Sequence, residues 1–101
     1  MKKWSFKQKN NKLVGNLFFS QAELDYHGFS SIDPFTIEKM FTEFIEDCYI
    51  AKYNQILVIT GKGRVVKPLV YKLLKNNKYV ESFKHASSQN GGEGAFEVLI
   101  K

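Results

Sequence analysis

An aspartate and a histidine separated by one residue are the clearest candidates in this chain for acid–base chemistry. They lie in the segment Leu24-Asp25-Tyr26-His27-Gly28. Because side chains alternate along a strand, a strand ending here places Asp25 and His27 on one face. The carboxylate can then orient the imidazole and stabilise its charged form, as a general acid or base requires. The alternative interpretation is a turn histidine beside a hydrogen-bonded aspartate, with no chemistry.

A second segment, Thr60-Gly61-Lys62-Gly63-Arg64, has the composition of an anion-binding loop. Its glycines let backbone N–H groups approach a phosphate, its two bases add charge, and the helix expected after it contributes a positive N-terminal end. The predicted phosphate-binding residues are Thr60, Gly61, Lys62, Gly63, Arg64 and Lys67. The segment is not a G-x-x-x-x-G-K-[ST] motif, so a nucleotide hydrolase is poorly supported. The alternative is that its glycines serve only the turn from strand to helix.

Two parallel strands are expected to bring these segments together. Residues 23–26 predict a first strand, and the continuous apolar run at 55–60 predicts a central strand parallel to it. The carboxyl ends of parallel strands lie at one edge of a sheet, where open α/β sheets bind ligands. We therefore expect His27 to lie beside the Thr60–Gly63 loop.

Two amphipathic helices are expected to connect the strands. Asp33 fits a helix N-cap followed by Pro34 at the first helical position, and this helix is expected to end near 53–54. Its apolar residues recur at helical spacing: Ile37, Met40, Phe41, Phe44, Ile45 and Cys48. The second helix is expected from Val66 to 76–77.

The rest of the chain predicts an antiparallel strand pair at 79–84 and 95–100, joined by a flexible glycine-containing connection at 87–94. The order β-α-β-α-β-β predicts an α/β fold: an α+β sandwich with a mixed four-stranded sheet, two main helices and right-handed crossovers. Residues 21–101 form this domain, and residues 1–20 are a basic N-terminal extension. Within the extension, residues 13–19 either cover a core edge or add a short strand.

The composition is that of one folded domain, because 44% of the 101 residues are hydrophobic and 15% are aromatic. Cys48 is the only cysteine, so no intrachain disulfide can form, and its apolar helical setting favours a buried thiol over a reactive one. No apolar run approaches the roughly 18 residues of a membrane span, and the polar residues after Trp4 break any signal-peptide core. We expect a cytoplasmic protein with no membrane partner.

The net charge of +5 is unevenly distributed along the chain. Residues 1–20 hold five lysines and no acids, residues 21–54 hold two bases and seven acids, and residues 55–101 hold eight bases and three acids. A basic C-terminal half beside a basic arm indicates a polyanionic partner. The alternatives are solubilising surface lysines and, for the extension, a solvated tail. His85 has no partner motif and is interpreted as a surface residue.

Three motifs in register resemble the small MutS-related (Smr) domain family. The family is marked by an LDxHG strand end, a [HT]GxG loop after the second strand and a GGxGA segment before the last strand. This chain carries Leu24-Asp25-Tyr26-His27-Gly28, Thr60-Gly61-Lys62-Gly63 and Gly91-Gly92-Glu93-Gly94-Ala95 in that order. The match covers residues 22–101. The glycines of the last motif are interpreted as structural.

The resemblance implies a fold similar to the C-terminal domain of translation initiation factor three, with endonuclease or nicking activity. Some members act on DNA and others cut mRNA at stalled or collided ribosomes, so the implied partners are RNA or DNA and the ribosome. Asp25 and His27 carry over as catalytic residues, and the Thr60–Gly63 loop as the substrate-binding side. Thr60 stands where many bacterial members have histidine, which removes one candidate proton-transfer group. The stretch after Gly63 is shorter than in many members.

The resulting hypothesis is a nucleic-acid endonuclease in which Lys62, Arg64 and the loop amides hold a phosphate. His27 takes a proton from a ribose 2′-hydroxyl in RNA, or from water in DNA, while Asp25 orients the ring or helps to hold a divalent metal. One aspartate and one histidine make a sparse metal site, so we expect no cofactor and favour metal-independent RNA cleavage. The alternative function is a non-catalytic nucleic-acid- or ribosome-binding module. A small-molecule phosphate enzyme would need a lid that the sequence does not suggest.

Overall fold

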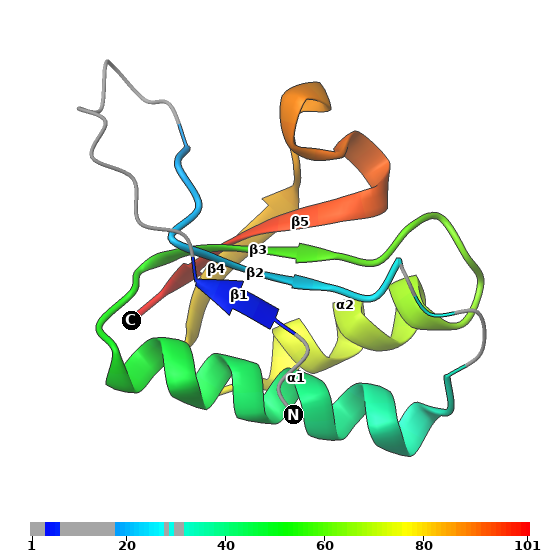
Figure 1. Ribbon diagram of the computed structural model, residues 1–101, viewed down its shortest axis with the longest axis horizontal. Helices are drawn as coiled ribbons and strands as arrows, with labels where there is room; N and C mark the ends of the chain where they lie inside the picture. Colours follow the sequence, from blue (N-terminus) through cyan, green and yellow to red (C-terminus); the bar gives the residue numbers. More distant parts are fainter. Residues whose placement is uncertain (1–3, 7–17, 28, 30–31) are drawn as a thin grey trace.

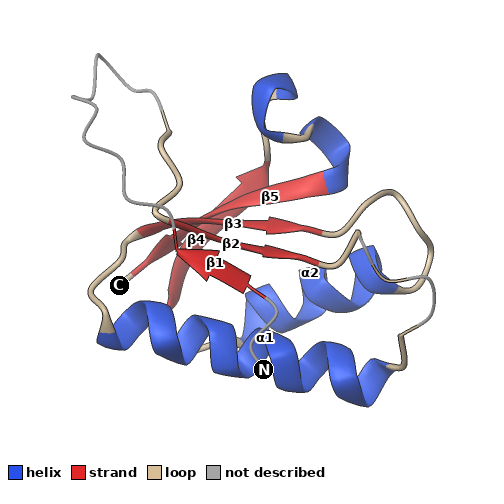
Figure 2. Cartoon of the chain, in the orientation of Figure 1, coloured by secondary structure: helices blue, strands red, loops and turns tan. Residues whose placement is uncertain are grey.

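A sheet and two α-helices form two layers in the computed structural model, which describes residues 4–6, 18–27, 29 and 32–101. Both helices lie on one face of the sheet (Figures 1 and 2). The elements, in chain order, are β1 (Trp4–Phe6), β2 (Ala22–Asp25), α1 (Pro34–Ile50), β3 (Gln55–Ile59), α2 (Val66–Asn76), β4 (Val80–His85), the short 3-10 helices η1 (Ser88–Asn90) and η2 (Gly92–Gly94), and β5 (Ala95–Ile100). The strand order in the sheet is β1-β2-β3-β5-β4.

The four predicted strands form the expected mixed sheet. β2 runs parallel to β3, with Leu24 opposite Val58, and β5 runs antiparallel to both β3 and β4. β4 therefore runs in the same direction as β3. As a result, the carboxyl ends of β2, β3 and β4 all lie at the same end of the sheet. The predicted α+β sandwich with two helices is confirmed.

A fifth strand, β1, extends this sheet beyond the prediction. It comes from the basic extension and pairs antiparallel with β2, with Ser5 opposite Glu23. The sequence also allows an extra strand at 13–19, but of that stretch only Phe18 and Phe19 are described, and neither lies in a strand. Phe18 packs beside Leu57 on the face of the sheet opposite the helices. A three-residue strand is too short for its side-chain alternation to be recognised in the sequence.

The core lies between the sheet and the helices, where the alternation along the strands predicts it. Leu24 and Tyr26 are buried against α1, whereas Asp25 and His27 are exposed. All six apolar residues predicted for the buried face of α1 are buried there, including the Cys48 thiol. The first motif therefore anchors itself in the core with one set of side chains and presents the other set at the surface.

The start of α1 follows the prediction, but its end does not. Asp33 caps the helix by accepting hydrogen bonds from the backbone N–H and the hydroxyl of Thr36, at 2.8 and 2.9 Å, and these bonds hold the pKa of Asp33 below its ordinary value. The helix ends at Ile50 because Lys52 adopts a left-handed conformation with φ 64°. Lys52 and Tyr53 donate backbone hydrogen bonds to the Tyr49 and Cys48 carbonyls, which is a Schellman motif. The sequence carries a lysine where glycine usually signals this ending.

Candidate active site

Asp25 and His27 lie at the carboxyl end of β2, and both are exposed. The Asp25 Oδ1 atom accepts a hydrogen bond of 2.8 Å from the backbone N–H of His27. This bond joins the carboxylate to the backbone and not to the imidazole ring, so the expectation that Asp25 orients the ring directly is corrected. Asp25 instead fixes the turn that carries His27. The turn predicted at Gly28 lies outside the described residues.

The His27 ring lies beside the loop that follows β3, as the topology predicts. A methyl group added at Gly61 would stand 3.6 Å from His27 Cδ2. The two strands are held together up to this point, because the Tyr26 N–H donates to the Ile59 carbonyl at 2.8 Å. The buried Tyr26 hydroxyl donates to the Ile37 carbonyl of α1 at 2.8 Å, and burial raises the pKa of this hydroxyl above its ordinary value. The histidine thus extends from a backbone that is anchored on both sides.

The glycine-rich segment before β5 packs against the same loop. The Gly94 carbonyl accepts hydrogen bonds from the Thr60 and Gly61 backbone N–H groups, at 2.8 and 2.9 Å. The buried Thr60 hydroxyl donates to the Gly61 carbonyl at 2.7 Å and lies 3.3 Å from the Gly94 carbonyl oxygen. Gly61 itself has a positive φ of 73°, which glycine adopts without strain.

These hydrogen bonds involve part of the predicted phosphate-binding set. The N–H groups of Thr60 and Gly61, and the Thr60 hydroxyl, already make hydrogen bonds to the Gly94 and Gly61 carbonyls in this structure, whereas the binding of phosphate by these two residues stays a prediction. Thr60 is also too buried to exchange protons with a substrate. The backbone groups that remain suitable are those of Lys62, Gly63 and Arg64, which are all exposed. A methyl group at Gly63 would meet no atom within 4 Å, so this part of the loop is open to a ligand.

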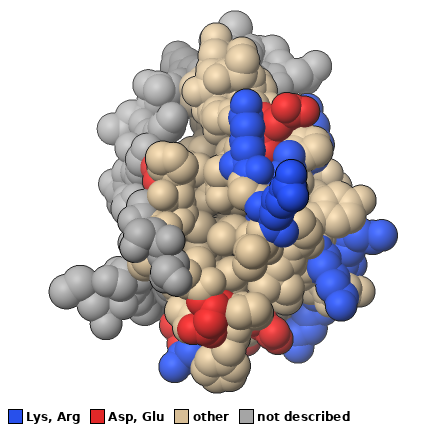
Figure 3. Space-filling view, turned by 90° about the vertical axis from the view of Figure 1, so that its right-hand side faces the viewer, with Lys and Arg blue, Asp and Glu red and all other residues tan. Residues whose placement is uncertain are grey.

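The cations predicted for this site lie on one side of the molecule. Lys62 and Arg64 are exposed, and Lys67 is half-buried in the first turn of α2. No side chain caps this helix, whose N-cap residue is Val65, so its N-terminal end adds positive potential. Figure 3 shows basic side chains from the centre to the right-hand margin of this face, with acidic ones beside them at the upper right and others along the lower margin. The face suits an extended anion.

Residues 24–101 match the Smr domain. The chain belongs to the Smr domain family. The three motifs that resembled this family are thus confirmed as its signature here. Endonuclease MutS2 of Streptococcus gordonii is 33% identical over 96 residues, which are 94% of this chain and 12% of that protein. Endonuclease MutS2 of Carboxydothermus hydrogenoformans is 29% identical over 80 residues, which are 78% of this chain and 10% of that protein. The chain therefore spans about a tenth of the length of these curated relatives.

Solved Smr structures have the same fold. The Smr domain of Thermus thermophilus MutS2 aligns with a TM-score of 0.70 at 22% identity, covering 78% of this chain and 96% of that one. YdaL of Escherichia coli, a stand-alone small MutS-related protein, aligns with a TM-score of 0.73 at 22% identity, covering 98% of this chain and 82% of that one. The two-layer architecture is therefore that of an Smr domain.

Sequence reasoning missed one residue that organises this Smr site. Glu97 of β5 is buried, and its Oε2 atom accepts hydrogen bonds from the Ser87 N–H at 3.0 Å and from the Asn90 side-chain amide at 3.2 Å. These bonds fix η1, which leads into the turn that presents the Gly94 carbonyl to Thr60 and Gly61. The available signal was an acid inside the otherwise apolar strand 95–100.

The described residues form neither a cluster of metal ligands nor a membrane-spanning helix. Residues 4–6, 18–27, 29 and 32–101 contain no group of three or more His, Cys, Asp and Glu side chains placed to hold a metal ion. Within the same part of the chain, neither helix is both long and apolar enough to cross a membrane.

Proposed function

We propose that this Smr domain cleaves phosphodiester bonds in nucleic acid, with RNA favoured over DNA. The observation that supports this most directly is the position of the His27 ring, which would lie 3.6 Å from a methyl group added at Gly61 and so stands beside a loop bearing Lys62 and Arg64. The relatives named endonuclease share the Smr region with this chain. We further propose that the protein works in the cytoplasm on RNA or DNA, with the ribosome as a candidate partner.

In this proposal Lys62, Arg64 and the exposed loop amides bind a backbone phosphate. With RNA, His27 takes the proton of the neighbouring 2′-hydroxyl, and the oxygen attacks phosphorus while the 5′-oxygen leaves and is protonated by solvent. The products are a 2′,3′-cyclic phosphate and a 5′-hydroxyl. With DNA, His27 would instead take a proton from an attacking water. The end groups of the products distinguish the two routes.

Asp25 is a positioning residue in this proposal. Its carboxylate holds the His27 backbone at 2.8 Å and so fixes where the ring stands relative to Gly61. Its negative charge can also stabilise the positive charge that the His27 ring gains when it takes the proton in the reaction. The two contributions can be separated, because Asp25→Asn keeps an acceptor oxygen and removes the charge, whereas Asp25→Ala removes both.

The test is a cleavage assay on labelled single-stranded RNA and on supercoiled plasmid, with the wild type beside His27→Ala, Asp25→Asn and Asp25→Ala. We expect His27→Ala to lose at least a hundredfold in rate, the range for removal of a general base. We expect Asp25→Asn to retain more activity than Asp25→Ala. Each reaction is run with and without EDTA, because metal independence remains a prediction. An RNA with one 2′-deoxy position should resist cutting at that position.

A matched control is Lys39→Ala, which removes an exposed base from α1, on the acidic side of the molecule. It should cut like the wild type, whereas Lys62→Ala and Arg64→Ala should lower the rate. Equal cleavage by wild type and His27→Ala would show that the activity belongs to a contaminant. Cleavage of DNA but not of RNA would support the endonuclease function and rule out the route through the 2′-hydroxyl.

A non-catalytic nucleic-acid-binding module is the second candidate function. Two observations favour it: the Asp25 carboxylate bonds to backbone and not to the imidazole, and Thr60 is buried and cannot transfer protons. This candidate predicts salt-sensitive binding of RNA or DNA with no cleavage by the wild type. Turnover that depends on His27 separates the two functions, whereas binding alone does not.

A further inference from the structure

Exposed and half-buried rings form a cluster where α2 meets the edge strand β4. Tyr71 of α2 packs edge-on against Phe83 of β4, with ring centroids 5.5 Å apart, and lies 6.3 Å from Phe96. His85 stacks on Phe96 at 5.1 Å with 21° between the ring planes. His85 is exposed, and Tyr71 is 46% exposed. We call Tyr71, Phe83, His85 and Phe96 the α2–β4 ring cluster.

The chain around this cluster is strongly basic. Residues 61–80, which include the whole of α2, contain six bases, namely Lys62, Arg64, Lys67, Lys72, Lys75 and Lys78, and no acid. The Lys75 Nζ atom lies 5.6 Å from the centroid of the Tyr71 ring, a cation–π distance. Basic side chains cover the right-hand side of the face in Figure 3. Rings interleaved with cations are the combination that binds single-stranded nucleic acid.

The cluster lies at the same end of the strands as the candidate active site, but on the helix side of the sheet, whereas Asp25 lies on the opposite face. His85 ends β4 and Asp25 ends β2, and these strands run in the same direction with β5 and β3 between them. Three strand spacings of about 4.8 Å separate the two ends by about 14 Å. Lys62 and Arg64 lie in the loop that leaves β3 at this same end of the strands, and Lys67 lies in the first turn of α2. A strand bound at His27 can therefore continue along cations to the cluster.

We propose that the α2–β4 ring cluster is a second binding surface of the same site, on which unpaired bases of a single-stranded nucleic acid stack against Tyr71 and His85. The proposal rests on the proposed function and names its substrate class as single-stranded. Stacking on a side-chain ring requires an unpaired base, because both faces of a paired base inside a duplex are already covered by its neighbours. Stacking tolerates any base, so we expect little sequence preference.

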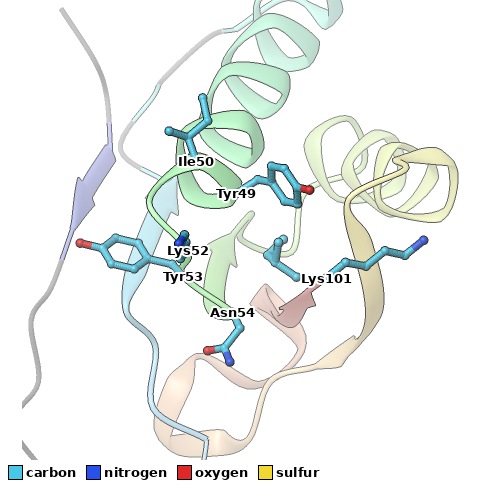
Figure 4. A pocket seen from close by; sticks show the side chains of 7 residues that line it. Tyr49, Ile50, Lys52, Tyr53, Asn54 and Lys101 are labelled. Atoms are coloured by element: carbon cyan, nitrogen blue, oxygen red, sulfur yellow. The ribbon is translucent and has the colours of Figure 1, made fainter.

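Another aromatic group in the described structure provides a contrast. Tyr49 stacks on Tyr79 with centroids 4.2 Å apart, and Tyr49 and Tyr53 border an open pocket of about 560 Å³ (Figure 4). This pocket lies where α1 ends and β3 begins, at the opposite edge of the sheet from His27. The helix leading into it, α1, carries four acids and one base. Tyr49 is 44% exposed, so it is a matched control for Tyr71.

The test measures the affinity of the full chain for a labelled oligouridylate and for a duplex RNA of the same length. Tyr71→Leu keeps an apolar side chain against Phe83 and removes the ring. We expect it to weaken oligouridylate binding roughly tenfold and to leave duplex binding unchanged. Tyr71→Phe, which keeps the ring, should bind like the wild type, and so should Tyr49→Leu. His85→Leu should also weaken oligouridylate binding. If Tyr71→Leu does not fold, His85→Leu replaces it as the test variant.

The outcomes separate this inference from the proposed function. Wild-type affinity in both Tyr71→Leu and His85→Leu, or an equal loss in Tyr49→Leu, would overturn the inference and leave cleavage by His27 unaffected. The same loss for duplex and single strand would also overturn it. If Tyr71→Leu loses oligouridylate binding but the wild type cuts nothing, the binding surface stands and the nuclease function fails.

Discussion

Gly61 and Gly63 stand two positions apart in one loop, yet their surroundings differ. Gly61 has a left-handed backbone, donates its N–H to Gly94 and lies beside the His27 ring. Gly63 has no positive φ and nothing around the position of a missing methyl group. The first glycine is therefore required by the fold of the loop. The second is required only if a ligand approaches the backbone there.

Alanine substitutions at the two glycines should separate stability from activity. Gly61→Ala places a side chain in the left-handed region and should lower the free energy of unfolding by about 1–2 kcal/mol. Gly63→Ala should change it by less than about 0.5 kcal/mol, the usual range for surface substitutions. Gly63→Ala should nevertheless reduce cleavage, because its methyl group occupies the space where a phosphate would approach. Urea unfolding and the RNA cleavage assay check both effects, and full activity in Gly63→Ala would show that no phosphate contacts that backbone.

Cys48 gives a prediction on pH. Burial, together with the negative charge of Asp47, raises the pKa of the Cys48 thiol to about 12. An unfolded cysteine ionises near pH 8.5, so the unfolded state loses this proton first and the folded state becomes less stable as pH rises. Between pH 8.5 and 10 the free energy of unfolding should fall by up to about 1.4 kcal/mol per pH unit more in the wild type than in Cys48→Ala. Parallel denaturant titrations of the two proteins measure the difference, and identical slopes would contradict it.

At the scale of elements, the loop after β3 depends on the turn before β5. Glu97 holds η1 through Ser87 and Asn90, and η2 presents the Gly94 carbonyl to the loop. The Thr60–Gly63 loop and the glycine-rich motif are thus parts of one hydrogen-bonded arrangement. A substitution of Glu97 should therefore loosen the loop at Thr60 and Gly61, although the Glu97 carboxylate hydrogen-bonds to Ser87 and Asn90 and to neither of these residues.

Glu97→Ala leaves two donors without their acceptor and should cost about 1–3 kcal/mol of stability. Glu97→Gln keeps an acceptor oxygen and should cost less. Amide hydrogen exchange at Thr60 and Gly61 should accelerate in Glu97→Ala beyond the change in global unfolding. Exchange at Tyr26, whose N–H bonds to Ile59 in the sheet, is the control. Unchanged protection at Thr60 and Gly61 would show that the turn holds the loop without Glu97.

The sequence predicts those features that follow from alternation and topology. The exposure of Asp25 and His27, the burial of Leu24 and Tyr26, and the approach of His27 to the Gly61 loop all follow from two parallel strands. The use of the Thr60 and Gly61 amides by Gly94 does not, because it depends on where a distant loop packs. The sequence also does not determine which group of His27 bonds to Asp25, because a carboxylate at this spacing can reach either the ring or the backbone N–H.

At the scale of the whole molecule, charge is divided between the two helices. Residues 34–50, which form α1, carry four acids and one base, whereas residues 61–80, which include α2, carry six bases and no acid. The resulting field favours approach of a polyanion from the side of α2 and disfavours approach from the side of α1. If a nucleic-acid strand binds as proposed, this asymmetry would orient it before any contact with His27 is made.

The dependence of binding on salt should therefore report which bases touch phosphate. For a single strand, the slope of log affinity against log salt is about −0.7 for each phosphate contact. Lys62→Ala and Arg64→Ala should each make the slope less steep by about 0.7, because both side chains are exposed beside the open part of the loop. Lys39→Ala on α1 should leave the slope unchanged, although it removes the same charge from the chain. Equal slope changes in all three variants would mean that affinity follows net charge alone and that the strand has no fixed path over the α2 side.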